Sequence, residues 1–397
     1  MRILNNLKET DLRQLMREIN VDPYGIKIML PKAQTYILKL NSLSNISANI
    51  LKQEMLSLGG DVAVARGALT GKVKKTDCLI IGNLAQLNRL SEKLVRQPFG
   101  LNNLAKDLTS ALKNYQKKNF KLVLGKHRLN LGERSYLMGI VNVTPDSFSG
   151  DGLYGLGFKT PDIVEYAQRL VDDGADIIDV GGESSRPKAK PVSLKDEISR
   201  VLPVIKALAK KIWVPISIDT YKPEVAELAL DNGASLINDI TGLRNIKMAK
   251  VAATFKAGVV IMHMRGKPRS MQNNPQYLSL IDEISGYLSA AIKRGEEAGI
   301  DKDKIIIDPG IGFGKTLEHN LEILKRLREF KVLGKPILIG TSRKAFIGKI
   351  LNVPEQERIF GTVASSVLAS EYGADIIRAH DVKAVKQALL IKEGIGK

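Results

Sequence analysis

Leu137-Met138-Gly139-Ile140-Val141-Asn142-Val143 is an apolar run of strand length, and the turn-forming pair Thr144-Pro145 follows it. A run of this kind, rich in β-branched residues and bounded by turn residues, predicts a buried β-strand. The same unit, a short apolar run followed by a longer amphipathic stretch, recurs to the end of the chain. The predicted strands cover residues 137–143, 176–180, 214–218, 236–238, 258–262, 304–308, 336–340 and 374–378. Helical patterns between them include residues 161–172, 194–209, 223–231, 277–298, 317–330 and 356–371.

This alternation determines the predicted fold class. Strands that alternate with helices pair in parallel through crossover connections, and eight such units in residues 134–397 suit a closed (β/α)₈ barrel, the TIM barrel. A doubly wound open sheet is the alternative on the pattern alone. Residues 1–133 predict a smaller α/β or α+β domain, because strand-like runs at 36–40, 61–65 and 78–81 are interleaved with helical patterns. The sequence gives no role for this first domain.

Charge and composition limit the partners. Of the formal net charge of +18, most lies in residues 1–133, where 22 Lys and Arg face 10 Asp and Glu. This excess of positive charge suggests an RNA-binding or scaffold role. The lysines are scattered, however, and no nucleic-acid motif accompanies them, so we interpret them as a solvent-exposed surface and do not expect nucleic acid as a partner. The one cysteine, Cys78, lies in an apolar run and is expected to be a buried structural thiol.

The chain also lacks features of membrane or exported proteins. No stretch of eighteen apolar residues occurs, and residues 1–6 lack the apolar segment of a signal peptide. We therefore expect no membrane partner and a cytoplasmic location. The sequence leaves the oligomeric state open, with a homodimer as one candidate.

Polar residues follow nearly every predicted barrel strand. In a barrel of this class the active site forms at the carboxyl ends of the strands, so these residues should share one surface. Each alone has an ordinary structural explanation, such as a turn or a helix cap. The residues that end the eight strands are, in order, Asn142, Gly181-Gly182-Glu183, Asp219-Thr220, Asn238-Asp239, His263, Asp308-Pro309-Gly310, Ser342-Arg343-Lys344 and Arg378-Ala379-His380-Asp381.

Taken in this order, these strings resemble dihydropteroate synthase. The resemblance runs from about Leu137 to the end of the chain and rests most on residues 138–149 and on Asp179-Val180-Gly181-Gly182-Glu183-Ser184-Ser185-Arg186-Pro187. The family joins a pterin pyrophosphate to p-aminobenzoate and releases pyrophosphate. A phosphate-binding P-loop at Gly314-Lys315-Thr316 is excluded, because the position that needs the first glycine is Pro309.

The resemblance implies a role for each of these positions. Asp308, Asn238 and Asp219 would bind the pterin together with Lys344 and Arg378, and a carboxylate at 308 could accept two parallel hydrogen bonds from the pyrimidine edge. Asp219, Lys344, Arg378 and His380 would carry catalysis.

The remaining roles concern the leaving group and the nucleophile. Asn142 would bind Mg²⁺ on the pyrophosphate, and Arg378 and His380 would donate to phosphate oxygens. The aminobenzoate site would consist of Ser185, Arg186, Pro187 and Phe313.

The sequence departs from the usual pattern of this family at two positions, and one alternative function shares the same fold. The family commonly has Ser-Asp-Gly-Gly where this chain has Ser149-Gly150-Asp151-Gly152, so no role is assigned to Asp151. Ser185 stands where threonine is frequent, which keeps the hydroxyl. The rival is a pterin-dependent methyltransferase on the same barrel. Such an enzyme expels no pyrophosphate, so the string Ser342-Arg343-Lys344 and the pair Arg378 and His380 favour the synthase.

Overall fold

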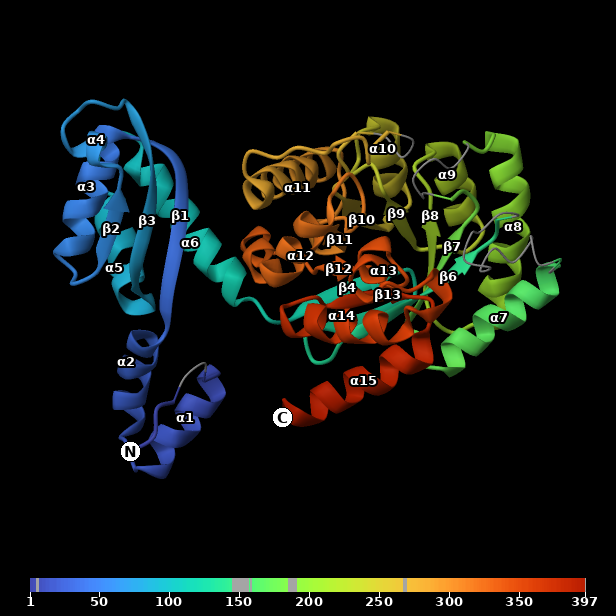
Figure 1. The fold of residues 1–397 in the computed structure, drawn as a ribbon, viewed down its shortest axis with the longest axis horizontal. Coiled ribbons are helices and arrows are strands. Elements are labelled where there is room, and N and C mark those ends of the chain that lie inside the picture. The colour runs from blue at the N-terminus through green and yellow to red at the C-terminus, as the bar shows by residue number, and fades with distance from the viewer. Residues whose placement is uncertain (5–6, 145–156, 158, 185–190, 267–269, 397) are drawn as a thin grey trace. The chain divides into compact units, whose positions relative to one another are not determined.

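The computed structural model describes residues 1–4, 7–144, 157, 159–184, 191–266 and 270–396 (Figure 1). The chain divides into two compact units, Met1–Lys113 and Asn114–Lys397. This division falls earlier than the predicted boundary after residue 133, because a β-hairpin within residues 120–131 belongs to the second unit.

The first unit is an antiparallel sheet packed against helices, the α+β form of the two predicted alternatives. Its three strands are ordered β1-β3-β2. Alternate residues of β3 are buried, which is the pattern of a sheet with one face on a core. Cys78 is buried on that face, and burial raises the pKa of its thiol, as expected of a structural cysteine. The elements are α1 (Glu9–Glu18), α2 (Pro23–Ala33), β1 (Thr35–Ser44), α3 (Asn45–Leu56), β2 (Asp61–Val64), α4 (Arg66–Leu69), β3 (Lys75–Asn83), α5 (Leu84–Leu94) and α6 (Leu101–Gln116).

The second unit contains the predicted barrel. Seven neighbouring pairs of strands in the order β11-β10-β9-β8-β7-β6-β13-β12 are parallel. A parallel bridge between Ile307 and Ile337 joins the two outer strands, and the amide N of Ile307 donates to the carbonyl O of Pro336 at 2.9 Å. The sheet therefore closes on itself, which excludes the open doubly wound alternative. The strands are β6 (Tyr136–Asn142), β7 (Ile177–Gly181), β8 (Ile216–Asp219), β9 (Leu236–Asp239), β10 (Gly258–Met262), β11 (Ile305–Asp308), β12 (Leu338–Ile339) and β13 (Ile376–Ala379).

Helices surround the strands (Figure 1). Their buried apolar side chains form one cluster with those of the strands. Several predicted helices are shorter in the structure. The pattern at 317–330 divides into α12 and a 3₁₀ turn, and the pattern at 356–371 begins as a helix only at Ile359. The helices are α7 (Thr160–Asp172), α8 (Leu194–Lys211), α9 (Pro223–Asp231), α10 (Ile246–Thr254), α11 (Leu280–Glu297), α12 (Leu317–Lys325), α13 (Ala345–Leu351), α14 (Ile359–Glu371) and α15 (Val382–Ile395), with 3₁₀ turns at Lys302–Lys304, Leu327–Leu333 and Glu355–Glu357.

A hairpin of β4 (Phe120–Leu124) and β5 (His127–Leu131) belongs to the barrel unit. Its inward residues Leu122, Leu124 and Leu131 are fully buried in a cluster with the apolar starts of the barrel strands, such as Tyr136 and Ile306. The hairpin thus closes the amino-terminal end of the barrel, opposite the strand ends that carry polar residues. The compact barrel unit of the structure therefore begins before the predicted boundary at residue 134.

No helix among the described residues is long and apolar enough to cross a membrane.

Candidate active site

The polar ends of the barrel strands surround one cavity of about 550 Å³. Asn142 from β6, Asp219 from β8 and Arg378 from β13 contribute to its wall, as the positions of strand ends in a closed barrel require. Further lining side chains come from the loops that follow β7, β11, β12 and β13, and include Glu183, Ser184, Phe313, Lys315, Ser342, Lys344 and His380. The sequence prediction that polar strand ends share one surface is confirmed for these residues.

An ion network lies at the centre of this site. The Arg378 guanidinium donates from Nε to Asp179 Oδ2 at 2.7 Å and from Nη2 to Asp219 Oδ2 at 2.8 Å. Asn238 donates from Nδ2 to the same oxygen of Asp179 at 3.0 Å. Three strands, β7, β8 and β13, are thereby joined through one cation, whose planar fork holds both carboxylates in fixed positions.

Burial makes this network electrostatically unusual. Removal from water raises the pKa of Asp219, and the charge of Asp179 adds to the rise although Arg378 opposes it. Asp179 is fully buried, and its Oδ1 has no hydrogen-bond partner among the described residues. A buried carboxylate oxygen without a donor is costly, so this atom is well suited to accept a hydrogen bond from a ligand.

Asp308 and Asn238 lie behind the cavity wall rather than in its lining. Both side chains are buried, and Asp308 Oδ1 accepts from the amide N of Gly310 at 2.7 Å. Burial raises the pKa of Asp308 to about 6, in spite of the Gly310 amide and the positive charges of Lys344 and Lys315. The carboxyl is therefore poised to ionise near neutral pH and to pair with a ligand that brings its own donors.

Asn142 and His380 meet at another part of the cavity. His380 Nε2 lies 3.5 Å from Asn142 Nδ2, and its Nδ1 lies 3.0 Å from Ser342 Oγ. The backbone N of His380 also donates to Ser342 Oγ at 3.2 Å. Ser342 therefore fixes the imidazole, whose other ring nitrogen faces the end of β6.

Phe313 and two lysines form a third part. Lys344 Nζ lies 4.4 Å from the centroid of the Phe313 ring, a cation–π distance. Lys315 is buried and donates to the carbonyl O of Phe313 at 3.1 Å, and its Nζ lies 3.0 Å from Nδ1 of His263. Burial lowers the pKa of Lys315 to about 7 and that of His263 to about 2, so His263 acts as a neutral acceptor.

The predicted aminobenzoate residues Ser185, Arg186 and Pro187 lie outside the described residues, as does Asp151. Sequence reasoning missed three residues of the site. Asp179, Ser342 and Lys315 lie within motifs noted above, but no role was predicted for them individually. An aspartate inside an otherwise apolar strand was the available signal for Asp179. Their importance arises from contacts with residues far away in the chain.

Metal ligands are sparse here. Within the described part of the chain, no group of three or more His, Cys, Asp or Glu is arranged to hold a metal ion. Mg²⁺ needs few protein ligands when a phosphate supplies the others, and an amide oxygen is a suitable one. Asn142, which lines the cavity, therefore fits a phosphate-bound Mg²⁺, and the site does not fit a metal held by protein alone.

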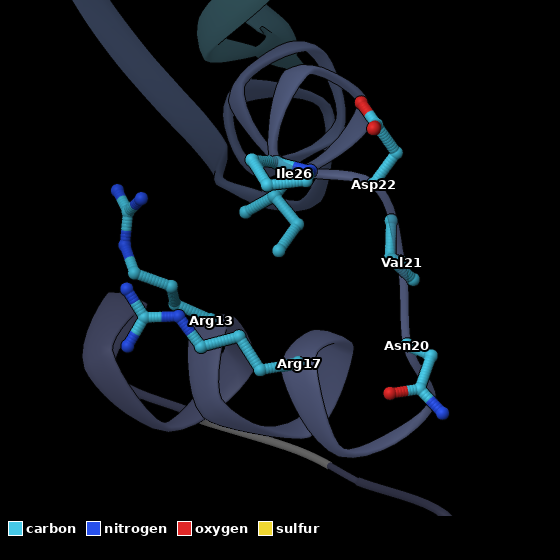
Figure 2. Close-up of a pocket in the computed structure, with 7 residues that line it drawn as sticks. Arg13, Arg17, Asn20, Val21, Asp22 and Ile26 are labelled. Carbon is cyan, nitrogen blue, oxygen red and sulfur yellow. The ribbon is translucent and has the colours of Figure 1, made fainter.

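A second pocket, of about 520 Å³, lies in the first unit between α1 and α2. Figure 2 shows Arg13 and Arg17 extending from α1, with Ile26 on α2 and Asn20 to Asp22 on the connection. Arg13 pairs with Glu9 at 2.8 Å, and Asp22 caps α2 by accepting from the amides of Tyr24 and Gly25. Arg13 and Asp22 thus have structural roles in this pocket.

A model of the pterin binding enzymes matches residues 138–380, which is more than half of the chain and spans Asn142 through His380. The chain belongs to the pterin-binding enzyme family.

Two of the similar proteins are dihydropteroate synthases. The dihydropteroate synthase of Synechocystis is 45% identical over 276 residues, which cover 69% of this chain and 94% of that protein. The crystal structure of the Yersinia pestis dihydropteroate synthase with a sulfonamide drug has a TM-score of 0.67 at 43% identity, and covers 70% of this chain and 99% of that one.

One relative also matches the first unit. A probable bifunctional folylpolyglutamate synthase/dihydropteroate synthase of Halobacterium salinarum is 38% identical over 384 residues, or 96% of this chain. A match of that extent includes most of Met1–Lys113. The chain spans 46% of that protein.

Proposed function

We propose that this chain is a dihydropteroate synthase, a transferase that condenses 6-hydroxymethyl-7,8-dihydropterin pyrophosphate with p-aminobenzoate in folate or related pterin biosynthesis. The observation that carries the proposal is a single barrel cavity that combines buried carboxylates with a set of cations. Carboxylates suit the donor-rich edge of a pterin, and cations suit a departing pyrophosphate. The identity of 45% with a synthase that this chain covers almost completely supports the same conclusion.

The pterin end of the proposed mechanism uses Asp308, Asn238 and Asp219. Asp308 would accept two hydrogen bonds from the pyrimidine edge, and Asn238 would hydrogen bond along the same edge. Asp219 lies in the cavity wall beside Arg378, so a negative charge there would stabilise the positive charge that develops on the pterin as its C–O bond breaks. Lys344 would donate to ring acceptors.

The leaving-group end uses Arg378, His380 and Asn142. Arg378 and His380 would donate to the phosphate oxygens, and Asn142 would supply an oxygen to Mg²⁺ bound to the pyrophosphate. That ion would neutralise charge on the leaving group. The reaction needs no protein nucleophile, because the arylamine nitrogen attacks the exocyclic methylene directly, and the protein contributes alignment and electrostatics.

The arylamine end uses Phe313, Ser185, Arg186 and Pro187. The ring of Phe313 lies at the cavity surface with Lys344 over it, which leaves an aromatic contact for the aminobenzoate ring. Small-molecule substrates are thus the proposed partners, and the cytoplasmic location and a homodimer remain predictions.

Release of pyrophosphate that depends on the arylamine tests this function. Purified protein with the pterin pyrophosphate and Mg²⁺ should release pyrophosphate rapidly only when p-aminobenzoate is added. Release at the same rate without any arylamine would show that the chain is a hydrolase and would contradict the proposal.

Asp308→Asn should reduce pterin pyrophosphate affinity by about 2 to 4 kcal/mol, the scale of a lost charge-assisted hydrogen bond plus an unpaired buried donor. The folded-state pKa of Asp308 is raised to about 6, so its carboxylate is lost as the pH falls through 6. Wild-type affinity should decrease below that pH more steeply than the affinity of the variant, which has no carboxyl to protonate. Isothermal calorimetry from pH 5 to pH 8 measures both effects, and wild-type affinity in the variant would refute the role of Asp308.

His380→Ala should raise the inhibition constant of added pyrophosphate about tenfold to a hundredfold, because a hydrogen bond to a charged group contributes about 1.5 to 3 kcal/mol. The Michaelis constant for p-aminobenzoate should change much less. Ser342→Ala is the matched control, since it removes the support of Nδ1 but keeps the imidazole, and it should give a smaller effect. Unchanged inhibition by pyrophosphate in His380→Ala would remove this residue from the leaving-group site and favour the methyltransferase.

A further inference from the structure

Lys222, which precedes α9, binds two carboxylates and a carbonyl at once. Its Nζ donates to Glu183, to Glu197 and to the carbonyl O of Val192, the last at 2.9 Å. The lysine and Glu183 side chains are only 16% and 13% exposed, and Glu197 is 1% exposed. Burial disfavours the ammonium, but the hydrogen bonds to Glu183 and Glu197 outweigh it, so the pKa of Lys222 is raised. This side chain therefore remains charged, with every donor engaged.

Two neighbours complete the cluster. Tyr221 donates from its hydroxyl to the second oxygen of Glu183 at 2.9 Å, and Thr220 donates to the second oxygen of Glu197 at 2.7 Å. Burial and the bond to Glu183 raise the pKa of Tyr221 to about 12. Three consecutive residues after β8 thus hold both carboxylates, and they follow Asp219 directly in the chain.

The partners of Lys222 lie on both sides of residues 185–190. Glu183 comes two positions before that segment, and Val192 comes two positions after it. Glu183 and Ser184 also line the cavity. One ammonium therefore fixes the part of the cavity wall from which the chain enters this segment and the point at which it returns.

The backbone at Gly182, just before Glu183, lies against α8 with no room for a side chain. A Cβ on Gly182 would lie 2.6 Å from Val201 Cγ1 and 3.0 Å from Glu197 Cγ, so the chain passes directly over α8. The carbonyl O of Gly182 accepts from Arg200 at 2.9 Å. Polar links to α8 and to the loop after β8 thus set the position of this stretch, and Lys222 is the link that reaches both of its sides.

We propose that Lys222 is a positioning residue for the arylamine: it fixes the cavity wall at Glu183 and Ser184, and so sets arylamine affinity without contacting the pterin. This inference rests on the proposed function, in which the residues that follow Ser184 bind p-aminobenzoate. Lys222 would act on the nucleophile through Glu183. Of the proposed pterin contacts, Asp308 and Asn238 come from other strands, and Asp219 is held by Arg378, so pterin affinity should change little.

Steady-state kinetics and calorimetry of Lys222→Met test the proposal. The Michaelis constant for p-aminobenzoate should rise about tenfold or more, because loss of one partner of a buried ion pair leaves uncompensated charge that rearranges its surroundings. The dissociation constant of the pterin pyrophosphate should stay within about twofold. Lys222→Arg should recover part of the arylamine affinity, since it restores the charge.

Further variants separate positioning from general stability. Glu183→Gln weakens only the ion pair between Lys222 and Glu183. It should raise the Michaelis constant for p-aminobenzoate by less than Lys222→Met does. The double variant should be no worse than Lys222→Met, because both changes break one link. Lys335→Met is the matched control: Lys335 is 10% exposed and binds Glu296 and the carbonyl O of Lys302, but it precedes β12 at the other end of the barrel. It should lower the melting temperature and leave both constants unchanged.

The outcomes distinguish this inference from the function beneath it. Wild-type protein that binds the pterin pyrophosphate but does not turn over p-aminobenzoate would contradict the proposed function. Active wild type together with an unchanged arylamine constant in folded Lys222→Met would contradict only the positioning role. Equal losses of pterin and arylamine affinity would also overturn it, since they would show a general collapse of the site.

Discussion

Arg378→Ala should abolish measurable turnover and weaken pterin pyrophosphate binding by about 1.5 to 3 kcal/mol, the scale of a lost hydrogen bond to a charged group. It should also lower the stability of the protein by about 3 to 5 kcal/mol, the cost of removing one partner from a buried ion pair. The guanidinium holds Asp179 and Asp219 together, and both carboxylates would lose their compensating charge. Without Arg378 the pKa of Asp219 should rise further, because this cation is the main influence that lowers it. The proposed leaving-group contact would be lost as well.

Arg134→Ala provides the control for this variant. Arg134 also forms a two-pronged pair, with its Nη1 2.9 Å from Asp176 Oδ2, but at the amino-terminal end of the barrel. It should cost stability and leave pterin affinity intact. Calorimetry with the pterin pyrophosphate and kinetics of both folded variants make the comparison. Near wild-type turnover in Arg378→Ala would contradict the site as described.

Two truncations should behave in opposite ways. Removal of residues 1–113 should leave a folded barrel with pterin affinity and turnover, because the proposed site residues and the β4–β5 hairpin remain. Removal of residues 1–133 also deletes Phe120, Leu122, Leu124 and Leu131 from their cluster under the barrel. At about 1.5 to 3 kcal/mol for each buried side chain, the loss is about 6 to 12 kcal/mol, comparable to the whole stability of a domain.

Thermal unfolding and pterin binding of the two truncated proteins check this expectation. The longer protein, which starts at residue 114, should melt cooperatively and bind the pterin pyrophosphate. The shorter protein, which starts at residue 134, should be insoluble or lack a cooperative transition. A shorter protein as stable as the longer one would mean that the hairpin contributes nothing to the barrel. An inactive but well-folded longer protein would mean that the first unit contributes to catalysis.

The barrel could be predicted because its strands are buried on both faces. Such strands are continuous β-branched runs, which stand out against the amphipathic helices between them. The segment at 336–340 was recognisable, but only Leu338–Ile339 forms the strand. The β4–β5 hairpin was missed, because its five-residue strands carry lysine, arginine and asparagine on the outer face and a polar segment precedes them.

The site was predictable by position more than by contact. Asp219, Arg378 and His380 end their strands, so the fold alone places them at one surface. The partners of these residues were not predictable, since Arg378 and Asp179 are separated by 199 positions in the chain. The same holds for Lys222, which joins residues on either side of a segment more than thirty positions away. No local pattern contains such distances.

Identification of the product tests the central claim most directly. The protein is incubated with the pterin pyrophosphate, Mg²⁺ and ring-labelled p-aminobenzoate, and the products are analysed by mass spectrometry and by a pyrophosphate assay. The account predicts 7,8-dihydropteroate that carries the label, formed in equal amount to pyrophosphate. Unconsumed p-aminobenzoate, together with a pterin that gains or loses only a methyl group, would contradict it.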